Sequence, residues 1–304
     1  MPYVLAAAVA QGMNVKTSIL NANPALCVPP DTKGTIPSTV VPYGTKACAG
    51  ADEFVVSNVG GAAVGDPARG GGTTVQNALA QSSDTAFVDL AHRIGTQNIE
   101  RMAGQLGVNV APYAEGGGSG LVNYTGQVGM ALGVAPLTVN EQATMLSTIA
   151  DNGQYHQAHV VKYWERGASG ARLLPKVGQH AALTPQQAAD VQYAMETTTV
   201  KGTAAQTVTF GQRHPGTVIG TIGTTVNSHS GSFLGATNQY SLVVGMFTVN
   251  PVDKDNLAEL GGSGSASHWP AKIWNTFAEA EFAKTPTPFP ANPPSVGQAW
   301  NQVG

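Results

Sequence analysis

The feature that most constrains the fold is a change of hydrophobic period near residue 205. Before it, apolar side chains recur at helical spacing; after it come strand-like runs at residues 217–220, 233–236 and 240–247. The last two runs flank the short turn segment Thr237–Gln239, which predicts a hairpin. Helices followed by antiparallel strands and a final helix predict an α+β fold rather than repeated βαβ units.

Six helical segments precede the strands. Residues 3–13 predict a helix with Tyr3, Leu5, Ala6 and Val9 on a buried side. Between residues 73 and 107 we expect three short helices, which begin near Thr74, after Ser82-Ser83-Asp84 and at Thr96. Capping boxes, with Glu or Gln three residues after a capping Thr, open two more helices at Thr138 and Thr184.

The other expected elements are a strand at residues 159–164 and a closing helix after Pro270. That helix is expected to bury Ile273, Trp274 and Phe277. Residues 21–72 are rich in Pro and Gly, with short strands expected at 39–41 and 54–56. The segment contains both cysteines, Cys27 and Cys48, which either form a disulfide that closes a loop or are two unrelated thiols.

Composition and charge exclude several classes of function. Charged residues make up only 11% of the chain, the net charge is −3, and no basic run is present, so we expect no nucleic-acid partner. The apolar residues 4–10 are too short to span a bilayer and follow no basic segment, so we expect neither an export signal nor an anchor in this sequence. His156 and His159 have no third ligand at metal-site spacing, and we expect neither a metal nor a cofactor.

Two short motifs, in a fixed order, carry chemical information. Ser82-Ser83-Asp84-Thr85-Ala86-Phe87 alone is typical of a helix N-cap, and Gly220-Thr221-Ile222-Gly223-Thr224-Thr225 alone is typical of an ordinary strand. Together they resemble the second and third motifs of penicillin-binding proteins and β-lactamases, whose ordered set is S-x-x-K, S-x-N and K-T-G. Residues 129–138, the helix at 1–13 and residues 270–274 also resemble the transpeptidase domain of bifunctional (class A) penicillin-binding proteins.

The resemblance implies a serine β-lactamase/DD-transpeptidase-like fold, with an antiparallel sheet, flanking helices and a helical subdomain. It also implies peptidoglycan cross-linking by acyl transfer from D-Ala-D-Ala stem peptides, inhibition by β-lactams, and a place on the extracytoplasmic face of the plasma membrane. Carried over by position, Ser82 is the catalytic candidate, and the substrate-binding candidates are Asp84, Thr221, Gly223, Thr224 and Thr225.

The sequence departs from the family pattern at its charged and reactive points. Thr221 and Ile222 replace the Lys and Thr of K-T-G, Asp84 replaces the Asn of S-x-N, and S-x-x-K is absent. We expect a domain that is truncated at its N-terminus, lacks the first strands of the family sheet and its membrane anchor, and is catalytically inactive. Neither His229 nor Lys201 is expected to replace the missing groups.

The expected division of the chain is a partial transpeptidase-like domain at residues 1–285 and a Pro-rich extended tail at 286–304. Two other functions stay open. A non-catalytic module that binds cell-wall peptide or a partner protein is favoured by Thr221 and Ile222. A β-lactamase-like hydrolase is disfavoured by the long early loop and the tail.

Overall fold

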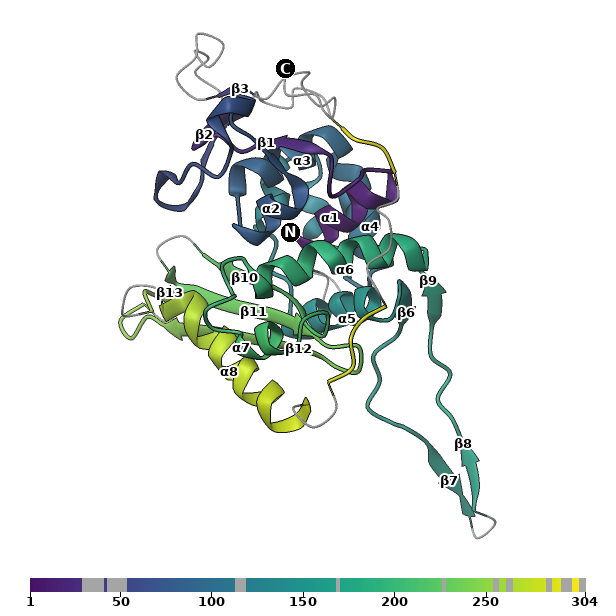
Figure 1. The fold of residues 1–304 in the computed structure, drawn as a ribbon. Helices are drawn as coiled ribbons and strands as arrows, with labels where there is room; N and C mark the ends of the chain where they lie inside the picture. Colours follow the sequence, from purple (N-terminus) through teal and green to yellow (C-terminus); the bar gives the residue numbers. More distant parts are fainter. Residues whose placement is uncertain are drawn as a thin grey trace.

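The antiparallel sheet predicted from the change of period is present and lies at the centre of the molecule (Figure 1). The computed structural model describes residues 1–28, 41–42, 54–112, 119–167, 170–225, 228–253, 257–260, 265–282, 286–290 and 297–300. In the sheet the strand order is β10-β11-β12-β13, and all neighbours are antiparallel. The strands are β10 (Ile219–Thr224), β11 (Ser230–Ala236), β12 (Ser241–Val249) and β13 (Leu257–Ala258). The α+β prediction and the hairpin at 237–239 are therefore confirmed.

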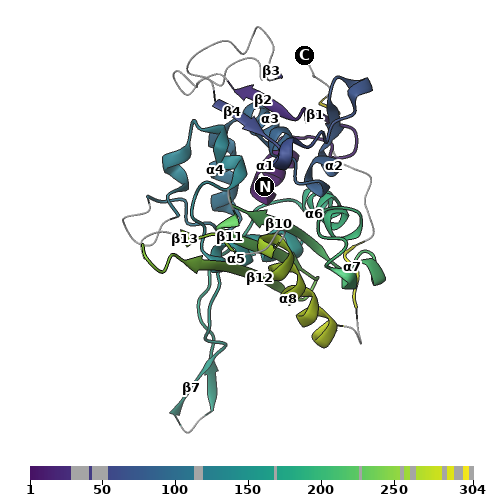
Figure 2. The ribbon, with the colours of Figure 1, turned by 90° about the vertical axis from the view of Figure 1, so that its left-hand side faces the viewer.

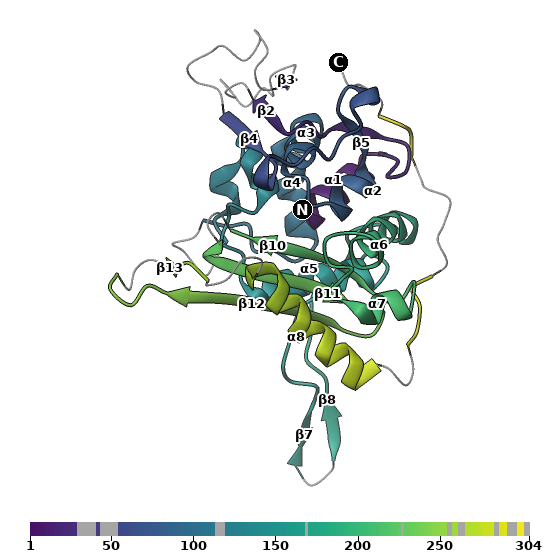
Figure 3. The ribbon, with the colours of Figure 1, turned by 60° about the vertical axis from the view of Figure 1, so that its left-hand side comes forward.

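Helices cover both faces of this sheet (Figure 3). Helix α8 (Ser265–Phe282) packs on one face, and α5 (Val139–Ala150) and α6 (Pro185–Val200) pack on the other. Side chains of β11 alternate between the two cores: Phe233 contacts Trp274 of α8, with ring centroids 5.5 Å apart, whereas Leu234 joins the core on the opposite face.

Two glycines of β11 allow α8 to approach closely. A Cβ atom at Gly231 would lie 1.5 Å from the Ala266 carbonyl oxygen, and one at Gly235 would lie 2.5 Å from the Trp274 ring. Only one stripe of α8 meets the sheet, so Trp274 is buried, while Ile273 and Phe277 are exposed. The prediction that all three are buried was wrong for these two. The helix also begins before Pro270 rather than after it.

The helical part surrounds α1 (Pro2–Ala10), in which every residue from Pro2 to Val9 is buried, not only one side. The predicted start at Thr74 and the capping boxes at Thr138 and Thr184 are confirmed, and the helix expected after Ser82-Ser83-Asp84 begins at Asp84 itself. The remaining helices are α2 (Val75–Ala80), α3 (Asp84–Ile94), α4 (Thr96–Gln105), α7 (Thr209–Arg213), and the 3-10 turns η1 (Val59–Gly61), η2 (Pro67–Arg69), η3 (Leu121–Tyr124) and η4 (Val128–Leu132).

Short strands line the outer side of the helical part. They are β1 (Ile19–Asn21) with β5 (Gly72–Thr74), and β2 (Ala25–Val28) between β3 (Val41–Pro42) and β4 (Phe54–Ser57). The strand expected at 54–56 is confirmed, whereas residues 39 and 40 lie outside the described residues. Cys27 on β2 is buried and takes part in a disulfide. Cys48 lies outside the described residues.

A narrow antiparallel ribbon leaves the body beside α5 (Figures 1 and 2). Its base pairs β6 (Gln154–His156) with β9 (Gln179–Ala181), and its outer part pairs β7 (Trp164–Arg166) with β8 (Ala171–Leu173). The prediction of a strand at 159–164 was wrong. Residues 157–163 leave the body without forming a regular ladder, and strand pairing resumes only at Trp164.

The described residues of the C-terminal segment contact the helical part. The Phe289 N–H donates to the Gly216 carbonyl at 2.7 Å, and Gln298 bridges Met13. In the portion of the chain that the structure describes, no helix has the length and apolar character needed to cross a membrane.

Candidate functional site

A cleft of about 640 Å³ lies between the start of α3 and the sheet. Its walls come from the start of α1, the residues that open α3, the segment 132–139, and strands β10, β11 and β12. The sequence-predicted site residues all line this cleft, although they come from two distant parts of the chain: Ser82, Asp84, Thr221, Gly223, Thr224 and Thr225.

The first wall is the turn that opens α3. Ser83 is the N-cap, and its hydroxyl accepts a hydrogen bond from the Ala86 N–H at 3.3 Å. Asp84 is the first helical residue and lines the cleft. Ser82 has a φ of 52°, in the left-handed region that few residues other than glycine adopt. Within the described residues its hydroxyl has no hydrogen-bond partner.

Asn58, which the sequence analysis did not single out, holds this turn from behind. Its side-chain oxygen accepts from the Ser83 hydroxyl, the Thr85 N–H and the Thr85 hydroxyl, each at 3.1 Å. Its amide donates to the Ala62 carbonyl at 2.9 Å. Because Asn58, Ser83 and Thr85 are all buried, this amide fixes the backbone on which Ser82 and Asp84 stand.

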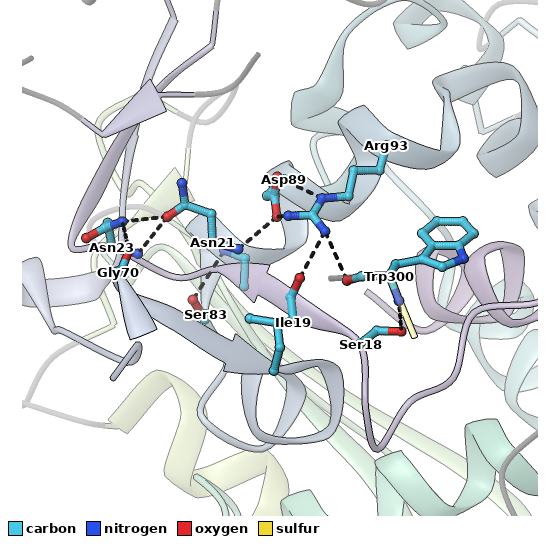
Figure 4. Close-up of polar contacts among 10 residues, drawn as sticks. Ser18, Ile19, Asn21, Asn23, Gly70, Ser83, Asp89, Arg93 and Trp300 are labelled. Carbon is cyan, nitrogen blue, oxygen red and sulfur yellow. Dashed lines mark hydrogen bonds and ion pairs between the residues drawn. The ribbon is translucent and has the colours of Figure 1, made fainter. Parts of the chain in front are cut away.

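A second polar cluster holds the rest of α3 against β1 (Figure 4). The Asp89 carboxylate accepts from the Asn21 N–H at 2.8 Å and pairs with Arg93 at 2.6 Å. Arg93 in turn donates to the carbonyls of Ile19, at 2.9 Å, and Trp300, at 3.5 Å. Burial raises the pKa of Asp89, while the neighbouring guanidinium acts to lower it. These bonds fix the helix that forms the first wall.

The second wall is β10, which has no further strand on its outer side among the described residues. The Thr225 N–H donates inward, to the Ser230 carbonyl at 3.1 Å. Backbone groups of an antiparallel strand alternate in direction, so those of Ile222 and Thr224 point to the free edge. The N–H and C=O of Thr224, which is exposed, are thus available to a ligand.

The side chains of β10 leave this edge open. Thr221 is buried, and Gly223 contributes no side chain: a Cβ there would lie 2.6 Å from the Ser232 hydroxyl oxygen. Ile222 packs against the core beneath α8. The strand therefore offers the cleft its backbone, together with the exposed Thr224 and Thr225.

Electrostatically, the cleft has no cationic side chain: none of the described residues that line it is Lys or Arg. Burial raises the pKa of Asp84 to about 6, so the carboxylate is mainly ionised at neutral pH. At neutral pH the cleft is therefore slightly negative.

Several residues considered in the sequence lie outside the cleft. Lys201 is the exposed C-cap of α6, and neither it nor His229 is among the lining residues. His156, at the end of β6, lies 3.1 Å from the carboxylate of Asp151, the C-cap of α5. In the described ranges no group of three or more His, Cys, Asp or Glu side chains could hold a metal ion.

A third wall of the cleft is formed by residues 132–139. The sequence of this segment resembles the transpeptidase family but did not predict a place in the site. It lines the cleft with Leu132, Val134, Pro136 and Leu137. The buried Tyr3 hydroxyl donates to the Met130 carbonyl at 2.5 Å and joins this segment to α1. Only the fold could reveal this wall, because its apolar residues show no regular period.

Solved structures share this fold. PonA1 from Mycobacterium tuberculosis has a TM-score of 0.69 and 20% identity, over 99% of this chain and 73% of that one. Penicillin-binding protein 1A from Haemophilus influenzae has a TM-score of 0.68 and 15% identity, over 96% and 43%. Penicillin-binding protein A from M. tuberculosis has a TM-score of 0.58 and 21% identity; the match covers 91% of this chain and only 58% of that one.

In sequence, no curated protein matches the chain. The family model described as the penicillin binding protein transpeptidase domain matches residues 52–252, about two thirds of the chain. This range includes the turn that opens α3, the segment 132–139 and strand β10, so the model covers most of the cleft. The chain belongs to the transpeptidase domain family of penicillin-binding proteins, which is related to peptidoglycan cross-linking.

Proposed function

We propose that the chain binds an extended peptide, the stem peptide of peptidoglycan, along the free edge of β10 and does not acylate itself on it. The observation that carries this proposal is the open backbone edge at Thr224, inside a cleft opposite Ser82 and Asp84. A peptide laid along such an edge extends the sheet: main-chain hydrogen bonds supply affinity and the adjacent walls supply specificity. Thr225 and Ser82 add hydroxyl groups to the same cleft.

The absence of acylation is inferred from the groups around Ser82. A serine hydroxyl is a weak nucleophile and needs a base beside it, such as a lysine of lowered pKa. The described lining of the cleft contains neither lysine nor arginine, and buried Thr221 stands where the family places a cation. The ionised Asp84 accepts hydrogen bonds but donates none, and it repels a ligand carboxylate.

β-Lactams are proposed as weak, non-covalent ligands of this cleft. PonA1 is described in complex with penicillin V, and penicillin-binding protein A as an acyl-enzyme with imipenem. We also propose an extracytoplasmic location, on the basis of family membership. The disulfide of Cys27 supports it, because disulfides persist in oxidising compartments.

The test compares peptide binding by three forms of the chain, measured by calorimetry with a D-Ala-D-Ala-terminated stem pentapeptide. Thr224→Pro removes the hydroxyl and the outward N–H, which takes no part in the ladder with β11, and proline is tolerated at such an edge. Thr224→Val keeps that N–H and removes the hydroxyl. We expect Thr224→Pro to weaken binding about tenfold, the value of one hydrogen bond, and Thr224→Val to change it less than about threefold.

Equal affinity of the parent chain and Thr224→Pro, with unchanged melting temperatures, would exclude the β10 edge as the binding site. A peptide that binds none of the three forms would exclude peptide binding altogether.

A further inference from the structure

The ribbon formed by residues 154–181, here called the arm, takes no part in the cleft. Its base is fixed to the body: the Tyr155 and His180 rings lie 4.7 Å apart, and His180 bonds the Gln105 carbonyl at 2.9 Å. Figures 1 and 2 show β7 and β8 well outside the rest of the molecule. Because a two-stranded ribbon is marginally stable by itself, such a projection is a candidate contact surface.

The arm is basic in an acidic chain. It contains Lys162, Arg166, Arg172 and Lys176 and a single acidic residue, Glu165, for a formal charge of +3. The whole chain has a net charge of −3, so the remainder carries −6. All four basic residues are exposed. This separation of charge predicts an anionic partner for the arm and repulsion of that partner by the body.

The two faces of the outer ribbon differ. Trp164 and Leu173 lie directly opposite each other in the ladder and form an exposed apolar pair. On the other face, Arg172 pairs with Glu165 at 3.5 Å and stacks over the Tyr163 ring at 4.4 Å. Beyond the ladder, Val160 is fully exposed and Leu174 is 72% exposed. Aliphatic and aromatic side chains therefore stand among the cations.

We propose that the arm binds an anionic phospholipid surface, with Trp164 and Leu173 at the level of the headgroups and the basic residues beside them. Exposed Trp, Tyr and aliphatic side chains mixed with Lys and Arg have the chemistry of interfacial anchors. Because the arm projects from the body, it can contact a membrane surface while the body stays away from it.

The length of the arm separates the body from that surface. Eight residue steps from His156 to Trp164 span at most about 27 Å when extended. The Debye length at physiological ionic strength is about 8 Å, so charges of the body that lie farther than this from the surface are largely screened. Each Lys or Arg near an anionic surface strengthens binding about fivefold. The net charge of +3 on the arm therefore corresponds to roughly a hundredfold preference for anionic over neutral vesicles.

The experiment measures co-sedimentation of the full chain with vesicles of phosphatidylcholine alone or mixed with phosphatidylglycerol. Trp164→Ser is compared with Trp269→Ser on α8, since these tryptophans are 48% and 47% exposed. A double variant of the arm, Lys162→Glu/Lys176→Glu, is compared with a double variant of the body, Arg101→Glu/Lys201→Glu. The second variant reverses two exposed cations that lie outside the arm. Melting temperatures check that every variant is folded.

We expect the chain to bind the anionic vesicles and not the neutral ones. The charge reversal takes the net charge of the arm from +3 to −1 and is expected to remove the roughly hundredfold preference for anionic vesicles. Trp164→Ser is expected to weaken binding about fivefold, while both body variants bind like the parent. The proposal is overturned if the chain fails to bind anionic vesicles at low salt, or if arm and body variants lose affinity equally. It is also overturned if polyglutamate binds the arm and the anionic vesicles do not, because the partner is then an acidic polypeptide.

Discussion

Replacing Asn58 tests whether the turn that carries Ser82 and Asp84 is held by one buried amide. In Asn58→Ala, the Thr85 N–H loses its acceptor, and the Ala62 carbonyl loses a donor. The Ser83 and Thr85 hydroxyls, 3.2 Å apart, can still bond to each other. The unavoidable loss is therefore the hydrogen bond of the buried Thr85 N–H, which is left without an acceptor.

The expected cost follows from these groups. A buried donor without an acceptor costs about 1–3 kcal/mol, and the lost bond to Ala62 adds about 1 kcal/mol. We expect Asn58→Ala to lower the free energy of unfolding by about 3 kcal/mol. At about 2–4 °C per kcal/mol, the melting temperature falls by roughly 8 °C. Asn238→Ala, at an exposed turn, is the control and is expected to change stability by less than about 0.5 kcal/mol.

The measurements are thermal unfolding and amide hydrogen exchange. Faster exchange is expected at residues 82–86, where the turn loosens, and no change is expected in β10. A melting temperature within about 2 °C of the parent, together with unchanged exchange at residues 82–86, would show that Asn58 does not hold the turn.

Three further substitutions probe the site and its supports. The folded-state pKa of Asp84 lies above its ordinary value, so its ionisation costs stability as pH rises through about 6. Asp84→Asn should stabilise the chain by about 1 kcal/mol at pH 7.5, after allowance for solvent screening, and by less at pH 4.5, in denaturant titrations. Arg93→Ala leaves Asp89 buried and unpaired and should cost about 3–5 kcal/mol by the same assay. Trp274→Ala should cost about 3–5 kcal/mol, whereas Trp269→Ala should cost less than about 1 kcal/mol, in thermal unfolding.

Local signals predicted much of the fold. The capping boxes at Thr138 and Thr184 identified helix starts because a reciprocal pair of side-chain bonds depends only on residues three apart. The strand at 159–164 failed because β-branched and aromatic residues signal a strand even where no partner is present to form a ladder. On α8, apolar residues at helical spacing did not reveal which stripe meets the sheet.

The candidate site was predictable only in part. The ordered motifs placed Ser82, Asp84 and residues 221–225 in one site, and they do line one cleft. Asn58 escaped notice because its partners, Ser83 and Thr85, are 25 and 27 residues away. A lone Asn before a Gly-rich segment is typical of a turn, and only the fold shows its buried side chain.

The most direct test of the proposed function is the intact mass of the chain after incubation with excess benzylpenicillin. An acylating penicillin-binding protein, treated in parallel, gains the mass of one penicillin. We expect the chain to keep its original mass, because its described cleft holds no cationic side chain to activate Ser82. A stoichiometric adduct on Ser82, lost in Ser82→Ala, would contradict this account.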